Sequence, residues 1–170
     1  MEKRNVTVSA IVAAIVLIGD QLNKHWAETW LRTNGEYKIW DGVLHLRYVE
    51  NRGAAFGMMQ GGKWFFLAIT GIACAAMLYF LIKERKRLHF MMTFSIALLL
   101  SGAMGNLIDR VALGYVRDMI YVALIDFAVF NVADMAVTVG CCLLVLDLLF
   151  FKGKKYMEMM DKKPQTGENS

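Results

Sequence analysis

Two aspartates, Asp118 and Asp134, are the residues of this chain whose type and setting most favour chemistry. Each stands in a short polar segment at the end of a strongly apolar stretch. A carboxylate close to hydrocarbon costs about 2.5–3.5 kcal/mol on insertion scales, so it persists where it faces a polar cavity, finds a partner or carries out a reaction. The two aspartates therefore define a candidate site if the fold brings them together.

Two carboxylates within hydrogen-bond reach share one proton, because like charges a few ångströms apart cannot both ionise. The ionised member can take a proton from a water that attacks a peptide carbonyl, and the protonated member can donate to the developing oxyanion. Such aspartic-protease chemistry needs no metal, cofactor or nucleophilic side chain. The chain also lacks a His-Glu-x-x-His helix, a Gly-x-Ser-x-Gly elbow and a Gly-rich phosphate loop.

The acids also have structural interpretations when each is taken alone. Asp134 would lie in the first turn of a helix, where the helix macrodipole favours a negative charge. Asp109 can form a boundary ion pair with the adjacent Arg110, and Asp126 is expected in a solvated loop. The case for chemistry therefore depends on Asp118 and Asp134 acting as a pair.

Amides accompany the acids at helical spacing. Asn106 and Arg110 are separated by four residues, and Asn131 and Asp134 by three. Each pair shares one helix face where the local structure is helical. Two polar faces are therefore expected to converge near the ends of two apolar segments.

The elements that must position these residues are transmembrane helices. Hydrophobic residues make up 57% of the chain and only one proline is present, which is too apolar for a soluble domain. A spanning helix needs about 20 apolar residues. Four segments qualify and predict one integral membrane domain over residues 1–155, followed by a tail over 156–170; the spans lie at about residues 6–26, 64–82, 90–108 and 131–151.

Basic residues cluster at 3–4, 83–87 and 152–163, so these segments and both termini are expected in the cytoplasm. The net charge of +4 is explained by topology and by contacts to membrane lipids, and no nucleic-acid partner is needed. The first apolar run has no small-x-small cleavage pattern and is expected to remain attached.

The exported segment between the first two spans predicts a small antiparallel sheet over about residues 37–58. Asp41-Gly42 between two β-prone runs indicates a hairpin. The sheet leads into Asn51 and the small-residue string Gly53 to Gly57, which permits close approach of a substrate backbone. Taken alone, that string is better explained as a turn that returns the chain to the second span.

The cysteines carry no site. Cys74, Cys141 and Cys142 lie within predicted spans, without the spacing or the histidine partners of a zinc site and without an oxidising aqueous setting. They are interpreted as small apolar packing residues.

The ordered motifs of the chain resemble those of the bacterial lipoprotein signal peptidase (signal peptidase II) family. The resemblance covers about residues 6–150 and is carried by four boxes in order, namely Asp20 to Lys24, Asn51 to Phe56, Gly105 to Arg110 with Gly114 to Asp118, and Phe130 to Asp134. It implies an all-α membrane protein of four transmembrane helices with a small extracytoplasmic β-sheet, or cradle.

The resemblance also implies roles for individual residues. Asp118 and Asp134 would be the catalytic dyad, and Asp20 and Lys24 would support the site. Five residues would bind substrate: Asn51, Gly53, Asn106, Arg110 and Asn131.

The implied activity is that of an aspartic endopeptidase acting in the bacterial cytoplasmic (inner) membrane, with its active site near the outer face. The substrate would be a prolipoprotein carrying a diacylglyceryl cysteine, cleaved immediately before that cysteine. The enzyme would be monomeric and would need no cofactor or metal.

Four positions depart from the family pattern: Asn23, Arg117, Met119 and Met135. None of them removes a carboxylate. Arg117 is the most consequential, because a cation beside Asp118 would favour its ionised form if the two side chains met.

Two other function classes remain open from the residues alone. A small proton-coupled transporter would distribute acids through the membrane depth. The acids of this chain instead cluster on the exported side, with Asp147 alone near the other face, where Lys152 can pair with it. A four-helix assembly or chaperone subunit would leave Asp118 and Asp134 dispensable.

Overall fold

The computed structural model describes residues 3–53 and 62–161 of the 170-residue chain. Within these residues, four helices are long and apolar enough to cross a membrane. They are α1 (Lys3–Trp26), α3 (Lys63–Lys83), α4 (Phe90–Ala112) and α5 (Val132–Phe150). The prediction of a helical membrane protein with a small antiparallel sheet is confirmed.

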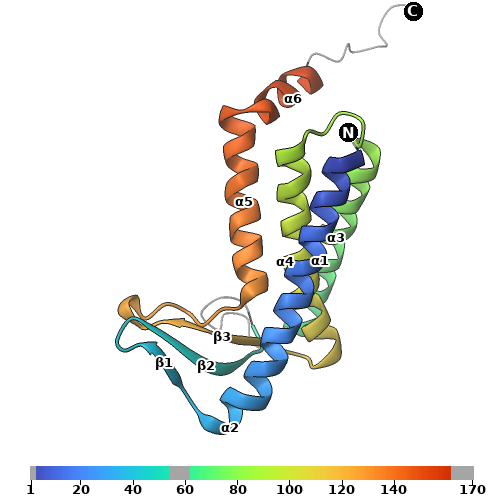
Figure 1. The fold of residues 1–170 in the computed structure, drawn as a ribbon. Coiled ribbons are helices and arrows are strands. Elements are labelled where there is room, and N and C mark those ends of the chain that lie inside the picture. The colour runs from blue at the N-terminus through green and yellow to red at the C-terminus, as the bar shows by residue number, and fades with distance from the viewer. Residues whose placement is uncertain (1–2, 54–61, 162–170) are drawn as a thin grey trace, which may run out of the picture.

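The spanning helices form a bundle with the sheet at one end, and the N-terminal end of α1 lies at the other end (Figure 1). Two helices are longer than their predicted spans. α1 continues through a π-helical turn, η1 (Ala27–Leu31), into α2 (Arg32–Asn34), and α4 runs past residue 108 to Ala112. Both extensions carry the polypeptide beyond the apolar segment towards the sheet.

α4 is the central helix of the bundle, because it contacts each of the other three spanning helices. Between α4 and α5 the backbones approach closely. A Cβ on Gly140 of α5 would lie 2.9 Å from the carbonyl oxygen of Ser95 in α4. Glycine at this position lets the two helices pack with direct backbone contact, as is common where helices associate in a membrane. This packing fixes the height of α5 relative to α4.

The sheet has three antiparallel strands in the order β1 (Tyr37–Trp40), β2 (Leu44–Asn51) and β3 (Val116–Val122). The predicted hairpin is confirmed: Gly42 has a positive φ of 72°, and Val43 N–H donates to the Trp40 carbonyl at 2.9 Å. Part of the predicted β region, residues 54–58, lies outside the described residues.

β3 was not predicted from the sequence, although it completes the sheet. It comes from the segment between α4 and α5 and continues into the short helix η3 (Ala123–Ile125). Asn51 pairs with Val116 and Val49 with Asp118, so the end of β2 lies beside the start of β3. This register brings the Asn51 motif next to the Asp118 motif.

At the opposite end of the molecule, α6 (Lys152–Asp161) follows α5. The tail predicted from residue 156 therefore begins inside a helix, and residues 162–170 lie outside the described part. Tyr156 is buried against Leu88 and Met92. Burial of an apolar ring therefore holds α6 against the bundle. The many charged residues of α6 gave no indication of this contact in the sequence.

The partner predicted for Asp147 was Lys152, whose side chain lies outside the described part of the structure. Asp147 is fully buried at this end, and its carboxylate lies 2.8 Å from His89 Nε2. The pairing residue is 58 positions away in sequence, on α4's N-cap, whereas the prediction considered only the nearby Lys152.

Candidate active site

The site is organised around the first turn of α5. Asn131 is the N-cap of this helix: its side-chain Oδ1 accepts from the Asp134 N–H at 3.0 Å, and its own N–H donates to Asp134 Oδ2 at 3.1 Å. This reciprocal capping box satisfies backbone donors that the helix start would leave unpaired. The spacing Asn-x-x-Asp thus fixes both the start of α5 and the orientation of the Asp134 carboxylate.

Asp118 reaches the same place from β3. Its Oδ1 accepts from Asn131 Nδ2 at 2.6 Å, and its Oδ2 accepts from Asn51 Nδ2 at 3.0 Å. Asn51 is held in turn, because its Oδ1 accepts from the Gly53 N–H at 3.0 Å. The single residue Asn131 therefore contacts both aspartates, and they lie together as the sequence required.

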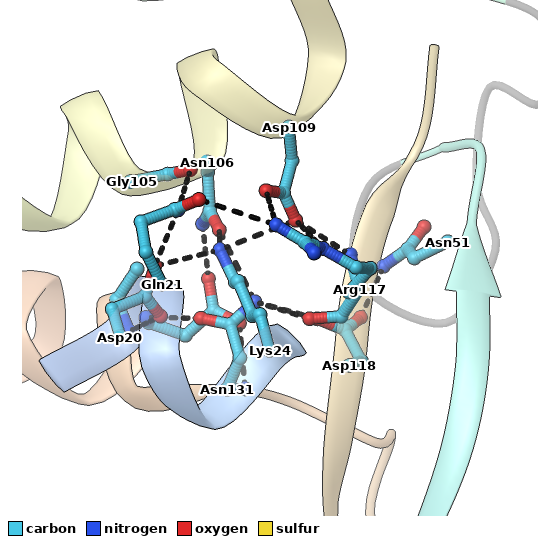
Figure 2. A network of polar contacts seen from close by, with 12 residues as sticks. Asp20, Gln21, Lys24, Asn51, Gly105, Asn106, Asp109, Arg117, Asp118 and Asn131 are labelled. Carbon is cyan, nitrogen blue, oxygen red and sulfur yellow. Dashed lines mark hydrogen bonds and ion pairs between the residues drawn. The ribbon is translucent and has the colours of Figure 1, made fainter. Parts of the chain in front are cut away.

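Asn106 and Lys24 complete the arrangement behind Asp134. Asn106 Nδ2 donates to Asp134 Oδ1 at 2.7 Å, and Asn106 Oδ1 accepts from Lys24 Nζ at 2.9 Å. Lys24 also forms an ion pair with Asp20 at 2.9 Å (Figure 2). Asp20 accepts from the Ala133 N–H at 2.9 Å, which ties α1 to the first turn of α5.

Arg110 and Gly53 contact each other beside the two aspartates. Arg110 NH2 donates to the Gly53 carbonyl at 3.3 Å, and its guanidinium lies 5.0 Å from the ring centroid of Phe66 in α3. Arg110 is thus positioned by α4, α3 and the end of β2, and not by its neighbour in sequence.

The predicted boundary ion pair between Asp109 and Arg110 is absent from the polar contacts of the described residues. Asp109 points instead into the protein, where it accepts from Arg117 at NH2 (2.7 Å), at Nε (3.2 Å) and at the backbone N–H (2.9 Å). Lys24 Nζ lies 3.5 Å from the same carboxylate. Successive helical residues point about 100° apart, so two adjacent residues rarely share partners.

Arg117 does not meet Asp118. Its guanidinium contacts Asp109 at 2.7 Å and Gln21 at 3.2 Å (Figure 2). It also contacts Glu28 at 2.9 Å. The reason is the strand itself, since consecutive side chains of a strand point to opposite faces. This departure from the family pattern thus joins β3 to α1, η1 and α4 on the face away from the dyad.

Two contributors, Gln21 and Glu28, were missed in the sequence. Gln21 donates to the Gly105 carbonyl at 3.1 Å and to Asp20, and Glu28 pairs with Arg117. Gln21, Lys24 and Glu28 follow the three- and four-residue spacing of one helix face, which is the signal that could have found them.

A cavity of about 540 Å³ opens onto the two aspartates. Its polar end is lined by Asn51, Asn106, Arg110, Asp118 and Asp134. Its other part is apolar and is lined by residues 127–130 before α5 and by Val137 and Val139 on α5. A polar reaction centre beside an apolar groove suits a substrate with both a peptide and a hydrocarbon part.

Burial raises the pKa of the Asp118 carboxyl to about 7, from an ordinary value of 3.8. The hydrogen bond from Asn51 opposes this shift, and the nearby charge of Asp134 adds to it. A carboxyl that keeps its proton near neutral pH beside a second carboxylate is the arrangement that acid–base hydrolysis of a peptide needs.

Asp126, between β3 and α5, lies in the solvated setting that was predicted for it. Asp126 is exposed and accepts from the Tyr121 hydroxyl at 2.6 Å. It has a left-handed φ of 47°, which aspartate tolerates better than most residues. Asp126 therefore belongs to a surface turn outside the cavity.

The chain was compared with known proteins. Residues 12–150 match the family model described as signal peptidase (SPase) II. A lipoprotein signal peptidase of Streptococcus thermophilus is 45% identical over 142 residues, which cover 83% of this chain and 92% of the relative. One of Clostridioides difficile is 43% identical over 145 residues, covering 85% and 97%.

Solved structures resemble the whole fold. A bacterial membrane enzyme determined by the in meso method at 2.3 Å resolution superposes with a TM-score of 0.78 at 33% identity, covering 95% of both chains. A second such enzyme, at 1.9 Å resolution, gives a TM-score of 0.76 at 36% identity, covering 85% of this chain and 94% of the other.

Proposed function

The chain belongs to the signal peptidase II family of aspartic peptidases, and from this premise we propose that Asp118 and Asp134 form its catalytic dyad. The enzyme removes signal peptides from lipoprotein precursors. Its substrates carry a diacylglyceryl group on a cysteine, and cleavage falls immediately before that cysteine. No side chain of the enzyme becomes covalently attached, because water is the nucleophile.

The observation that carries this proposal is the position of Asn131 between the two carboxylates. Its side chain donates to Asp118 at 2.6 Å and its backbone N–H to Asp134 at 3.1 Å. Both aspartates line the same cavity. One carboxylate removes a proton from water as the water oxygen attacks the peptide carbonyl, while the other donates a proton to the carbonyl oxygen.

The polar residues around the dyad divide into two roles. Arg110 and Gly53 lie at the edge of the cavity, where a fork of N–H donors and a backbone can hold an extended peptide. Asn51, Asn106 and Asn131 make their hydrogen bonds to the aspartates. These three amides were predicted to bind substrate. Their contacts favour a further role, which is to hold the two carboxylates in a fixed orientation.

The apolar part of the cavity suits the lipid of the substrate. It begins at the dyad and follows α5 from Asp134 to Val139. Acyl chains in the bilayer hold the precursor beside the enzyme, so the scissile bond needs only to reach the outer boundary.

The enzyme is a monomer of the cytoplasmic membrane with both termini in the cytoplasm and the dyad near the outer face. The basic segments at 3–4, 83–87 and 152–163 support this orientation. A reporter fused after Lys155 should therefore read as cytoplasmic, and one inserted between Asp41 and Gly42 as exported. The opposite pattern would contradict the orientation.

The decisive assay uses purified enzyme with matched precursors. A prolipoprotein is supplied with and without its diacylglyceryl group and is incubated with the wild type and with Asp118→Asn and Asp134→Asn. We expect cleavage of the lipidated precursor by the wild type only. Equal cleavage of the unlipidated precursor would overturn the substrate assignment, and turnover by either variant would overturn the mechanism.

A further inference from the structure

Lys24 is a fully buried cation with three polar partners in the described structure. Its Nζ contacts Asp20 at 2.9 Å, Asn106 Oδ1 at 2.9 Å and Asp109 at 3.5 Å. A lysine ammonium has three donors and no acceptor. Two carboxylates and one amide oxygen surround these donors, so the Nζ atom is held at one point behind the dyad.

Lys24 fixes the orientation of the Asn106 amide. A lysine cannot accept a hydrogen bond, so the amide must turn its oxygen towards Nζ. Asn131 Nδ2 donates to the same oxygen at 3.1 Å. The Asn106 NH2 group is thereby directed at Asp134 Oδ1, to which it donates at 2.7 Å.

The two aspartates consequently have different surroundings. Asp134 lies in the first turn of α5, where the helix dipole favours a negative charge, and it accepts from an amide that is polarised by Lys24. Asp118 lies on a strand, and its carboxylate accepts from two neutral side-chain amides, those of Asn51 and Asn131.

Other charges do not reverse this difference. Arg110 interacts with both aspartates, and the charge of Lys24 also acts on both. Only Asp134, however, accepts from the amide whose oxygen binds Lys24. Asp20 is near Asp134, but its own charge is answered by Lys24 and by the Ala133 N–H. Arg117 and Asp109 neutralise each other at 2.7 Å.

We propose that Lys24 is a positioning residue that acts through Asn106 to hold Asp134 as the ionised base, so that the shared proton resides on Asp118. The raised pKa of Asp118, caused first by burial, agrees with this assignment. The proposal rests on the proposed function, because it assigns roles within the same dyad.

The reaction then runs in a defined order. Asp134 removes a proton from water, the water oxygen bonds to the carbonyl carbon, and the Asp118 proton passes to the carbonyl oxygen, giving a neutral gem-diol. Asp118 next takes a proton from one gem-diol hydroxyl while Asp134 gives its proton to the nitrogen, and the C–N bond breaks. Both aspartates return to their starting states.

Infrared spectroscopy of the full-length purified protein tests where the proton lies, because a protonated carboxyl and a carboxylate absorb separately. Near pH 6 we expect a buried carboxylic-acid band in the wild type. Asp118→Asn should remove it, and Asp134→Asn should retain it. Asp147→Asn, which changes a buried aspartate at the other end of the protein, serves as the matched control and should leave that band in place.

Loss of the band in Asp134→Asn, or in both dyad variants, would overturn the assignment. This result is distinct from failure of the proposed function. If the dyad itself is wrong, Asp118→Asn and Asp134→Asn still cleave the precursor, whereas an incorrect proton assignment leaves both inactive.

The role of Lys24 is tested by the pH profile of kcat/KM. Lys24→Met should move the midpoint of the acidic limb upward by about 1 pH unit, because the base loses a nearby cation. Lys24→Arg keeps the charge and should restore most of the wild-type midpoint. Asn106→Leu should move the midpoint as Lys24→Met does, although Lys24 is intact. An unmoved midpoint in all variants that still unfold cooperatively would show that Lys24 is structural only.

Discussion

Gly105 is the position where the smallest change should disturb the site most. A Cβ at this position would lie 2.6 Å from Asp20 Oδ2 and 3.1 Å from the Ala133 Cβ. Asp20 cannot retreat freely, since its carboxylate binds Lys24 and the Ala133 N–H. Gly105→Ala must therefore displace either the ion pair or the first turn of α5.

The expected cost follows from opposing contributions. Alanine improves helix propensity by about 0.8–1.0 kcal/mol. Overpacking costs about 1–3 kcal/mol, and breaking a buried ion pair costs about 3–5 kcal/mol. We expect a net loss of about 2–4 kcal/mol in the free energy of unfolding, because part of the clash can be relieved by the Asp20–Lys24 ion pair and part by the first turn of α5. For a chain of this length, Tm should fall by about 5–15 °C.

Gly71→Ala is the matched control, because it also lies in a spanning helix and a Cβ there meets nothing within 4 Å. Its Tm should stay level or rise slightly, and cleavage should be unchanged. Thermal unfolding followed by tryptophan fluorescence, with cleavage measured on the same samples, compares the two variants. In the double variant Asp20→Ala with Gly105→Ala, the clash is removed, so Gly105→Ala should add little to Asp20→Ala. Equal Tm and activity in Gly105→Ala and Gly71→Ala would refute the close contact.

Three further predictions concern the two aspartates and Arg110. In cleavage assays, the double variant Asp118→Asn with Asp134→Asn should cleave little more slowly than either single variant, because the two residues act as a unit. Asp126→Asn should lower the cleavage rate only mildly, and a severe effect of Asp126→Asn alone would reassign the site. Arg110→Lys should lower kcat/KM by about tenfold or more, since a lysine cannot reproduce the planar fork, and near-normal kinetics would return Arg110 to a structural role. Because the pKa of Asp118 is raised to about 7, the folded protein holds this proton more tightly than the unfolded chain. The free energy of unfolding should therefore fall by up to about 4 kcal/mol as pH rises from about 4 to 7, and then level off. Asp118→Asn should lack this decline. The same pH dependence of the unfolding free energy in the wild type and in Asp118→Asn would contradict the raised pKa.

Hydropathy and motif order predict much of this protein. The spanning helices follow from length and apolar composition, and the turn at Asp41-Gly42 follows from local chemistry. The aspartates and their amides were identified because their motifs are contiguous in sequence. These features depend on neighbouring residues, which a single sequence displays directly.

The features that were missed depend on distant partners. The sequence predicts a loop where β3 lies, since Val116–Val122 has no clear polar and apolar alternation and becomes a strand by pairing with β2. The direction of Arg117 depends on Glu28, which is 89 positions away, and Asp147 contacts His89, which is 58 positions away. Sequence spacing alone does not select among partners at such separations.

The pairing of Asp20 with Lys24 has a consequence for biogenesis. The two residues are four apart on α1, so their opposite charges meet on one helix before any other helix is made. An isolated charge at the centre of a membrane helix costs about 2.5–3.5 kcal/mol on insertion, and an internal partner reduces this penalty. The first helix thus carries its own counterion into the bilayer. Asp109 is synthesised later, as part of α4, and then lies beside Lys24, whose charge is already paired with Asp20.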